Sequence, residues 1–306
     1  FDPDETKILI STESEQIYRH STKENYYIWD RKRKKLSPLS TGGKQMLAEF
    51  SPDGSKIAFV RDNNLFVVFM DSKQELQLTF DGKWNNIING KCDWVYEEEF
   101  GFDKAWFWSP DSYKIAYYRF DESNVKEFDL IKYGSLYPGD YKYKYPKAGE
   151  SNSVVEIHIA DVLTGTNKTI DVGTEKDQYI PRIKWTSNPD VLCITRLNRL
   201  QNKLELISAE YKGKTEPVKT NVFFTETSAT YLEIHDNLTF LKDGKGFIWT
   251  SEADGFNHIY LHDMSGKIMK KITNGSWDVT DFKGIDETTG ALYYVSSETS
   301  PTQRAL

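Results

Sequence analysis

The chain has 306 residues, of which 38% are hydrophobic and 28% are charged. This composition is typical of a globular protein and argues against a disordered one. The formal net charge of −7 argues against nucleic acid as a partner, because a protein that binds it needs a basic surface to displace counterions from phosphates. No apolar run approaches the roughly 20 residues of a transmembrane helix.

A turn signal followed by an apolar run recurs along the chain. Each copy begins with an aromatic or aliphatic residue, continues with Ser-Pro-Asp or a degenerate version of it, and leads into a segment with the pattern of a β-strand. In chain order the copies are FDPDETKILI (1–10), FSPDGSKIAFV (50–60), WSPDSYKIAYY (108–118), WTSNPDVLCIT (185–195), FLKDGKGFIWT (240–250) and IDETTGALYYV (285–295).

The spacing of these copies predicts an all-β fold, a β-propeller of four-stranded blades. Propeller blades repeat every ~40–50 residues, and stacking such sheets around an axis buries faces that one sheet cannot cover alone. The longer intervals would hold insertions. Because Phe1 lies at a turn signal and Leu306 closely follows the sixth copy, we expect residues 1–306 to be an excised arc of a larger propeller, with about five whole blades and incomplete ends.

Two segments interrupt the repeat. Residues 83–107 contain DWVYEEE and predict a short inserted helix, with Asp93 as N-cap and acidic residues near the positive end of the helix dipole. Residues 119–149 are rich in tyrosine and punctuated by Pro and Gly, and are too long for an ordinary loop. Since aromatic side chains are common at interfaces, this segment predicts an ordered arm with a contact surface.

Side chains that could bind metals or polyanions form no clear site. The basic run Arg31–Lys35 lies between strand-like segments and predicts a solvated turn, with a polyanion site as the weaker alternative. Cys92 and Cys193 have neither a disulfide framework nor zinc spacing. His258 and His262 lie four residues apart in a strand-like segment, where a metal site is the less favoured interpretation. We expect no metal and no cofactor.

Three strings together resemble the dipeptidyl peptidase IV family. They are Tyr-Arg-His-Ser at Tyr18–Ser21, Asp-Trp-Val-Tyr-Glu-Glu-Glu at Asp93–Glu99 and Tyr-Pro-Lys-Ala-Gly at Tyr145–Gly149. The second string is highly specific, and the resemblance extends over essentially the entire chain.

The resemblance implies the architecture and activity of the parent protein. In that family an N-terminal eight-bladed propeller precedes a C-terminal α/β-hydrolase domain, and the active site lies in the cavity between them. The enzyme is a serine exopeptidase that releases N-terminal dipeptides whose second residue is Pro or Ala. The family also implies an extracytoplasmic location and a homodimer to which the 119–149 arm contributes.

The resemblance also implies three substrate-binding residues. The family's Glu-Glu motif matches Glu98 and Glu99, which would bind the N-terminal amine, and its substrate-binding arginine matches Arg19. Glu97 falls outside this clamp. The chemistry agrees, because two carboxylates can share the several N–H donors of an ammonium group, and a guanidinium can donate to a peptide carbonyl. Residues 230–237 (TYLEIHDN) depart from the Arg-Phe-Arg sequence that some members carry.

No Gly-x-Ser-x-Gly nucleophile elbow occurs in the sequence, so we assign no catalytic residue. The chain is therefore predicted to bind and gate peptides with a free N-terminus for a hydrolase domain that it lacks, and to be inactive alone. The alternative is a non-catalytic propeller that serves as a protein-interaction module. An intracellular scaffold of the WD type is disfavoured, because the repeats lack the Gly-His and Trp-Asp signature.

Overall fold

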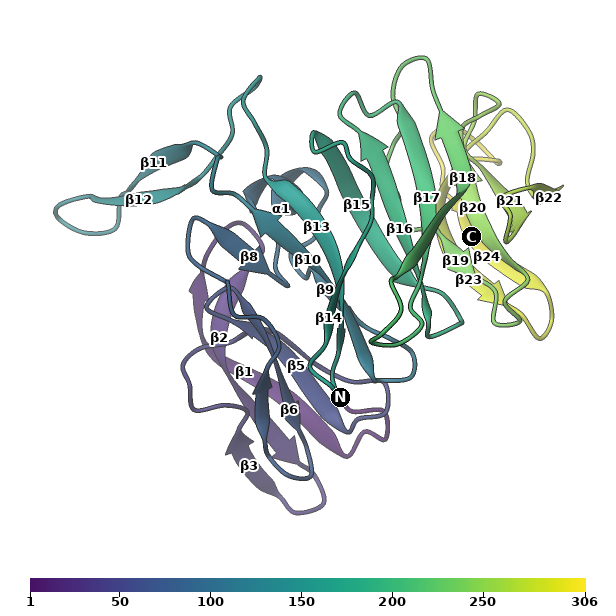
Figure 1. Cartoon of the computed structure of the whole chain (residues 1–306). Helices are drawn as coiled ribbons and strands as arrows, with labels where there is room; N and C mark the ends of the chain where they lie inside the picture. The colour runs from purple at the N-terminus through teal and green to yellow at the C-terminus, as the bar shows by residue number, and fades with distance from the viewer. The chain divides into compact units, whose positions relative to one another are not determined.

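The computed structural model describes residues 1–306, and almost all of its regular structure is antiparallel β-sheet (Figure 1). The chain divides into two compact units. One comprises Phe1–Pro181 and Tyr211–Lys219, and the other comprises Arg182–Glu210 and Thr220–Leu306. The one α-helix of the chain has six residues. No helix is both long enough and apolar enough to span a membrane.

The first unit contains three sheets, one hairpin and the helix. The N-terminal sheet has the order β1-β2-β3, with β1 (Lys7–Gln16), β2 (Thr22–Asp30) and β3 (Lys35–Pro38). The second has the order β4-β5-β6-β7, with β4 (Met46–Phe50), β5 (Lys56–Arg61), β6 (Asn64–Phe69) and β7 (Glu75–Gln77). The third runs β14-β13-β10-β8 with β9 also paired to β10, and contains β8 (Ile87–Asn89), β9 (Trp106–Trp108), β10 (Lys114–Asp121), β13 (Val154–Asp161) and β14 (Asn167–Ile170).

The second unit holds the C-terminal sheets. The sheet β15-β16-β17-β18 consists of β15 (Gln178–Trp185), whose first half belongs to the other unit, β16 (Val191–Asn198), β17 (Lys203–Glu210) and β18 (Lys219–Thr227). The next sheet consists of β19 (Thr239–Phe240), β20 (Gly246–Ser251), β21 (His258–Asp263) and β22 (Ile268–Lys271). The last pair is β23 (Val279–Asp286) with β24 (Ala291–Ser296).

The predicted fold class, a β-propeller of four-stranded blades, is confirmed. Four sheets have four or more strands, and a three-stranded sheet and a two-stranded pair lie at the two ends of the chain. Within the 83–107 segment only Trp94–Glu99 is helical, because Ile87–Asn89 and Trp106–Trp108 join the third sheet. In the 119–149 segment, β11 (Glu127–Lys132) and β12 (Gly139–Lys144) form a hairpin that extends away from the sheets of its unit (Figure 1).

The repeated turn signal has one geometry. In five of the six copies a backbone N–H donates to the carbonyl five residues later, at Asp2–Lys7, Ser51–Lys56, Ser109–Lys114, Thr186–Val191 and Leu241–Gly246. In the first three of these pairs the side chain of Asp2, Ser51 or Ser109 also accepts from the backbone amide of its partner lysine, at 2.7, 3.0 and 2.9 Å. The repeated signal therefore closes a tight turn, which in four of these five copies leads into a strand with a partner on each side.

Strand β5 shows why the apolar runs are continuous rather than alternating. Ile57 and Phe59 pack in a cluster with Ile28 of the first sheet. Ala58 and Val60 point to the opposite face and pack in another cluster, which includes Trp106 and Ile115 of the third sheet. Since successive side chains of a strand face opposite ways, both faces of this sheet are covered, and an apolar residue is favoured at every position.

The two cysteines and the two histidines at positions 258 and 262 are all buried. Cys92 and Cys193 are buried and free. His258 contacts the Thr273 hydroxyl at 3.1 Å and the Gly275 carbonyl at 3.0 Å, and His262 contacts the Gly266 carbonyl at 2.9 Å. These partners occupy both ring nitrogens of His258 and Nδ1 of His262.

Candidate functional site

Helix α1 (Trp94–Glu99) begins at Asp93, which confirms the predicted N-cap. The Asp93 carboxylate accepts from the Tyr96 amide at 2.9 Å and from the Ser153 hydroxyl at 2.6 Å. Burial raises the pKa of Asp93 above its usual value, while these hydrogen bonds act in the opposite direction. The cap fixes the start of a helix that would be too short to form alone.

Tyr96 anchors the helix to the sheets of its unit. Its ring packs against those of Phe100, Phe120 and Tyr179, at centroid distances of 5.0, 4.9 and 6.4 Å. Its hydroxyl accepts from the Ile180 amide at 2.8 Å. Because these contacts fix the position of Tyr96, they also determine where the side chains of the three glutamates that follow it point.

Glu98 lies beside Arg19, although 79 residues separate them in sequence. The Nε of Arg19 donates to both carboxylate oxygens of Glu98, at 3.0 and 2.9 Å. The Glu98 side chain is 17% exposed and that of Arg19 is 69% exposed, so the pair faces solvent. This contact uses only Nε, which leaves both Nη groups of Arg19 as donors for another molecule.

Glu99 lies next to Glu98 at the end of the helix and is exposed. Adjacent residues of a helix do not face the same way, and Glu99 makes no contact with Arg19. The structure therefore brings Glu98 and Arg19 together and places Glu99 beside them on the solvent side.

Glu97, which the resemblance left outside the clamp, is the residue that sequence reasoning missed. It is 1% exposed, and its Oε1 accepts from the backbone amides of His20 and Ser21, at 2.6 and 2.9 Å. Its other oxygen is buried without a partner. Glu97 thus ties the loop that carries Arg19 to the helix that carries Glu98. Three identical residues in a row gave no sign of this difference.

Further ionisable groups are buried next to the corner that helix α1 forms with the loop carrying Arg19. Glu122 is 2% exposed, and burial raises the pKa of its carboxyl to about 7, with Lys91 acting to lower it. Burial also lowers the pKa of Lys91, whose Nζ lies 5.7 Å from the centre of the Tyr18 ring. Buried charged groups are costly to maintain, and such clusters often accompany functional sites.

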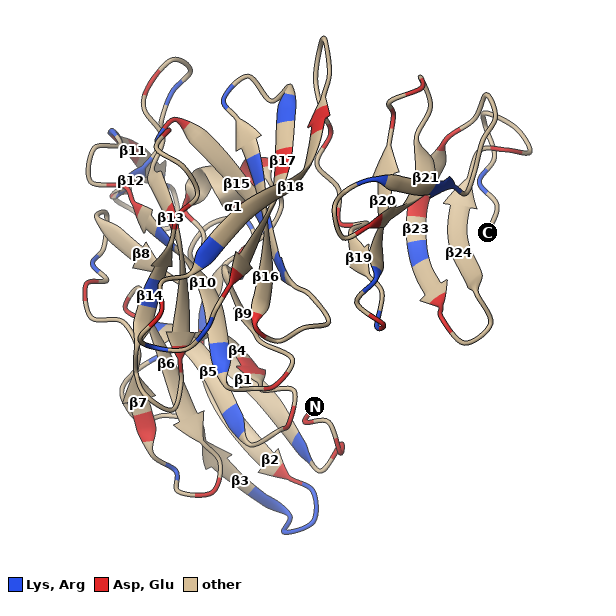
Figure 2. Ribbon diagram, turned by 45° about the vertical axis from the view of Figure 1, so that its right-hand side comes forward, with Lys and Arg blue, Asp and Glu red and all other residues tan.

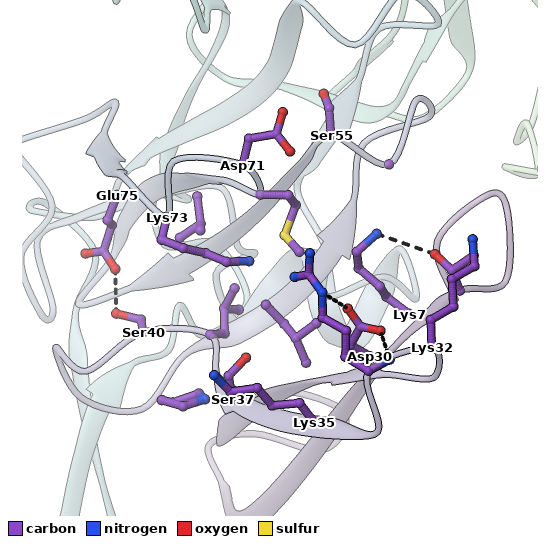
Figure 3. A pocket seen from close by; sticks show the side chains of 18 of the residues that line it. Lys7, Asp30, Lys32, Lys35, Ser37, Ser40, Ser55, Asp71, Lys73 and Glu75 are labelled. Carbon is purple, nitrogen blue, oxygen red and sulfur yellow. Dashed lines mark hydrogen bonds and ion pairs between the residues drawn. The ribbon is translucent and has the colours of Figure 1, made fainter.

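A cavity of about 760 Å³ elsewhere in the first unit is lined by both basic and acidic residues, including Lys7 and Lys73 (Figure 3). Three of its four carboxylates, those of Asp30, Asp53 and Glu75, are already engaged. Asp30 accepts from the Arg33 amide at 2.8 Å, and Glu75 accepts from the Ser40 hydroxyl at 2.5 Å. The cavity therefore presents no free pair of carboxylates for an amine.

The basic run Arg31–Lys35 lies next to that cavity and includes the turn between β2 and β3 (Figure 2). All five of its residues are exposed. The predicted solvated turn is therefore confirmed.

The divergent segment 230–237 lines a separate cavity of about 550 Å³ in the second unit. The Nε2–H group of His235 donates to the Thr250 carbonyl at 2.9 Å, and burial lowers the pKa of His235 to about 4. Glu226 accepts from the indole N–H of Trp249 at 2.8 Å. Polar groups in this cavity are therefore held in place by neighbouring side chains and backbone.

Comparison with known proteins gives a consistent result. A family model described as the dipeptidyl peptidase IV N-terminal region matches residues 2–306. Dipeptidyl aminopeptidase B of Saccharomyces cerevisiae is 32% identical over 99% of this chain and 38% of its own length. A probable dipeptidyl-aminopeptidase B of Talaromyces marneffei is 30% identical over 99% of this chain and 36% of its own length.

Solved structures agree with these matches. The crystal structure of Porphyromonas gingivalis dipeptidyl peptidase 4 superposes with a TM-score of 0.93 at 42% identity, covering 99% of this chain and 43% of that protein. A putative dipeptidyl aminopeptidase IV of Bacteroides ovatus, at 24% identity and a TM-score of 0.74 over 90% of this chain and 41% of that one, supports the fold. The chain thus spans about two fifths of the length of the proteins that it matches.

Proposed function

Because the chain belongs to the dipeptidyl peptidase IV family, of which it forms the N-terminal region, we propose that it binds the free N-terminal amine of peptide substrates at Glu98 and Glu99. Arg19 would hold a carbonyl of the same peptide. The contact between Arg19 and Glu98 carries this proposal, since it unites an acceptor of ammonium with a donor to carbonyls on one solvent-facing corner.

The chemistry of the amine explains the need for acidic residues. A peptide α-amino group has a pKa of about 7.7–8.0 and is largely protonated at neutral pH. Carboxylates accept its N–H groups in charge-assisted hydrogen bonds, which are about twice as strong as neutral ones. A blocked N-terminus lacks both the charge and the donors, and would offer the two carboxylates no ammonium N–H group to accept from. The site would therefore select peptides with a free amine and set the position of the following residues relative to that amine.

Cleavage would require the rest of the protein. We propose a serine hydrolase domain that attacks the bond after the second residue, Pro or Ala, while this chain positions the substrate and gates its access. The sequence of 306 residues contains no nucleophile elbow. This chain by itself would bind peptides without hydrolysing them.

The arm favours an additional role as a contact between two copies of the protein. Its tip exposes Tyr133, Leu136 and Tyr137, at 81%, 90% and 82%. Large exposed apolar side chains are typical of interfaces. A homodimer through residues 119–149 accounts for their exposure, and the alternative function as a protein-interaction module uses the same surface.

Steady-state kinetics of the full-length protein test the amine site. Glu98→Gln and Glu99→Gln keep the size of the side chain and remove its charge. A hydrogen bond to a charged group is worth about 1.5–3 kcal/mol, so we expect kcat/KM on Gly-Pro substrates to fall at least roughly tenfold. Glu216→Gln, at an exposed position, is the matched control. If both variants behave like this control, the proposed site is wrong.

A further inference from the structure

We propose that the arm is also a positioning element of the amine site. In this inference, which rests on the proposed function of Arg19 and Glu98, Tyr141, Tyr143 and Tyr145 hold the two halves of that site together. These three residues are called the tyrosine row, and residues 17–21 are called the Arg19 loop.

The tyrosine row is continuous. Alternate residues of an extended chain lie on the same face, and the rings of Tyr141, Tyr143 and Tyr145 follow one another at centroid distances of 5.8 and 6.0 Å. The backbone of Tyr145 prolongs the hairpin by donating to the Lys126 carbonyl at 2.9 Å. The row therefore runs along β12 and past its end as one continuous edge.

One end of the row contacts the Arg19 loop. The hydroxyl of Tyr141 donates to the Ile17 carbonyl at 3.4 Å. The ring of Tyr143 packs on that of Tyr18, the residue before Arg19, with centroids 5.5 Å apart. Tyr143 is 5% exposed, so this contact is a buried one.

The other end of the row contacts helix α1. The ring of Tyr145 lies against that of Trp94, the first helical residue, at a centroid distance of 4.2 Å. Aromatic contacts of this kind contribute about 0.5–1.5 kcal/mol beyond the area that they bury. The row thus links the loop that carries Arg19 to the helix that carries Glu98.

The Arg19 loop depends on such support, because it contains no regular strand. Glu97 holds it through the amides of His20 and Ser21, and the side-chain amide of Gln16 donates to the Arg19 carbonyl at 3.0 Å. The tyrosine row contacts the residues on the N-terminal side of Arg19. The backbone of Arg19 is therefore restrained on both sides, which limits where its mobile side chain can reach.

The exposed tip and the tyrosine row belong to the same hairpin. Strand β12 carries Tyr141 and Tyr143 and pairs with β11 in continuous register from Lys132–Gly139 to Glu127–Lys144. A second copy of the protein that contacts the tip would therefore act on the element that supports the amine site. Dimer formation and substrate anchoring would share one structural part.

The test compares Tyr143→Ala, Tyr143→Phe and the exposed control Tyr293→Ala in the full-length protein. For Tyr143→Ala we expect faster amide hydrogen exchange in residues 17–21 and a KM for Gly-Pro substrates at least threefold higher, with a smaller change in kcat. Tyr143→Phe keeps the ring and should restore both values, whereas a merely structural role would lower the amount of folded enzyme without raising KM. If Tyr143→Ala does not fold, Tyr141→Phe, which removes only the bond to Ile17, is measured in the same way.

The possible outcomes separate this inference from the proposed function. Unchanged exchange and KM in Tyr143→Ala, or in Tyr141→Phe where it replaces that variant, overturn the positioning role, even where Glu98→Gln is damaging. Faster exchange with a raised KM supports it. Faster exchange together with silent Glu98→Gln and Glu99→Gln overturns the proposed amine site, and with it the positioning role, and leaves the row as a structural support only.

Discussion

Sheet β4-β7 and the corner formed by helix α1 and the Arg19 loop bury opposite kinds of side chain. Strand β5 buries Ile57, Ala58, Phe59 and Val60 completely, and every one of them contacts other apolar groups. The corner buries Lys91, Asp93, Glu97 and Glu122 to 4% exposure or less. Two carboxylate oxygens there, one from Glu97 and one from Glu122, have no hydrogen-bond partner.

The difference teaches where this molecule departs from the packing that maximises stability. Burial of apolar surface stabilises a fold by about 25 cal/mol per Å², whereas a buried charge costs free energy unless it is well paired. Residues 57–60 of strand β5 follow the first rule. The corner violates the second at the place where a charged ligand is proposed to bind, which is typical of a site maintained for function.

The largest effect is expected in the sheet. Phe59→Ala removes a fully buried ring that stacks on Phe66 at a centroid distance of 5.5 Å. We expect the free energy of unfolding to fall by about 3–5 kcal/mol, because the cavity left behind cannot be refilled. Chemical denaturation measures the change, with Leu36→Ala at a half-exposed position as control. A loss below about 1 kcal/mol would show that the two apolar clusters are loosely packed.

A smaller, pH-dependent effect is expected in the corner. Burial raises the pKa of Glu122 from 4.5 to about 7, Lys91 and Lys144 favour its charged form, and Asp93 and Asp121 oppose it. The folded protein therefore retains a proton that the unfolded chain releases. The stabilisation that results from this difference in the pKa of Glu122 is fully present below pH 4.5. It is lost as the pH rises through about 7, which lowers the free energy of unfolding by at most about 3 kcal/mol.

Glu122→Gln tests this prediction, because glutamine stays neutral at every pH. Unfolding measured from pH 4.5 to 8 should show a shallower fall in stability for the variant than for the wild type. Identical pH profiles would mean that Glu122 titrates normally and that the corner is open to water.

The smallest effect is expected at a repeated turn. Ser51 is 1% exposed, accepts from the Lys56 amide at 3.0 Å and donates to Asp53 at 2.6 Å. Ser51→Ala should lower the unfolding free energy by about 1 kcal/mol, the usual worth of one such hydrogen bond. Ser151→Ala, at an exposed position outside any strand, should be silent. Equal behaviour of the two variants would contradict a stabilising role for the turn.

The sequence by itself determined the fold class and the start of the helix. Local signals were sufficient for these features, because a Ser-Pro-Asp turn and an N-cap aspartate act within five residues of themselves. The apolar runs predicted the strands, since a strand covered on both faces needs no alternation. The family motif indicated Arg19, Glu98 and Glu99 as one group, and the structure brings Arg19 and Glu98 within 3.0 Å.

Only the tertiary structure decided what each residue of that group contacts. Three consecutive glutamates are identical in sequence, yet one is buried under the Arg19 loop, one pairs with Arg19 and one is exposed. The link between Tyr143 and Tyr18 spans more than 120 residues. Contacts of this kind depend on how sheets and a hairpin fold back on one another, and no local pattern of side chains contains that information.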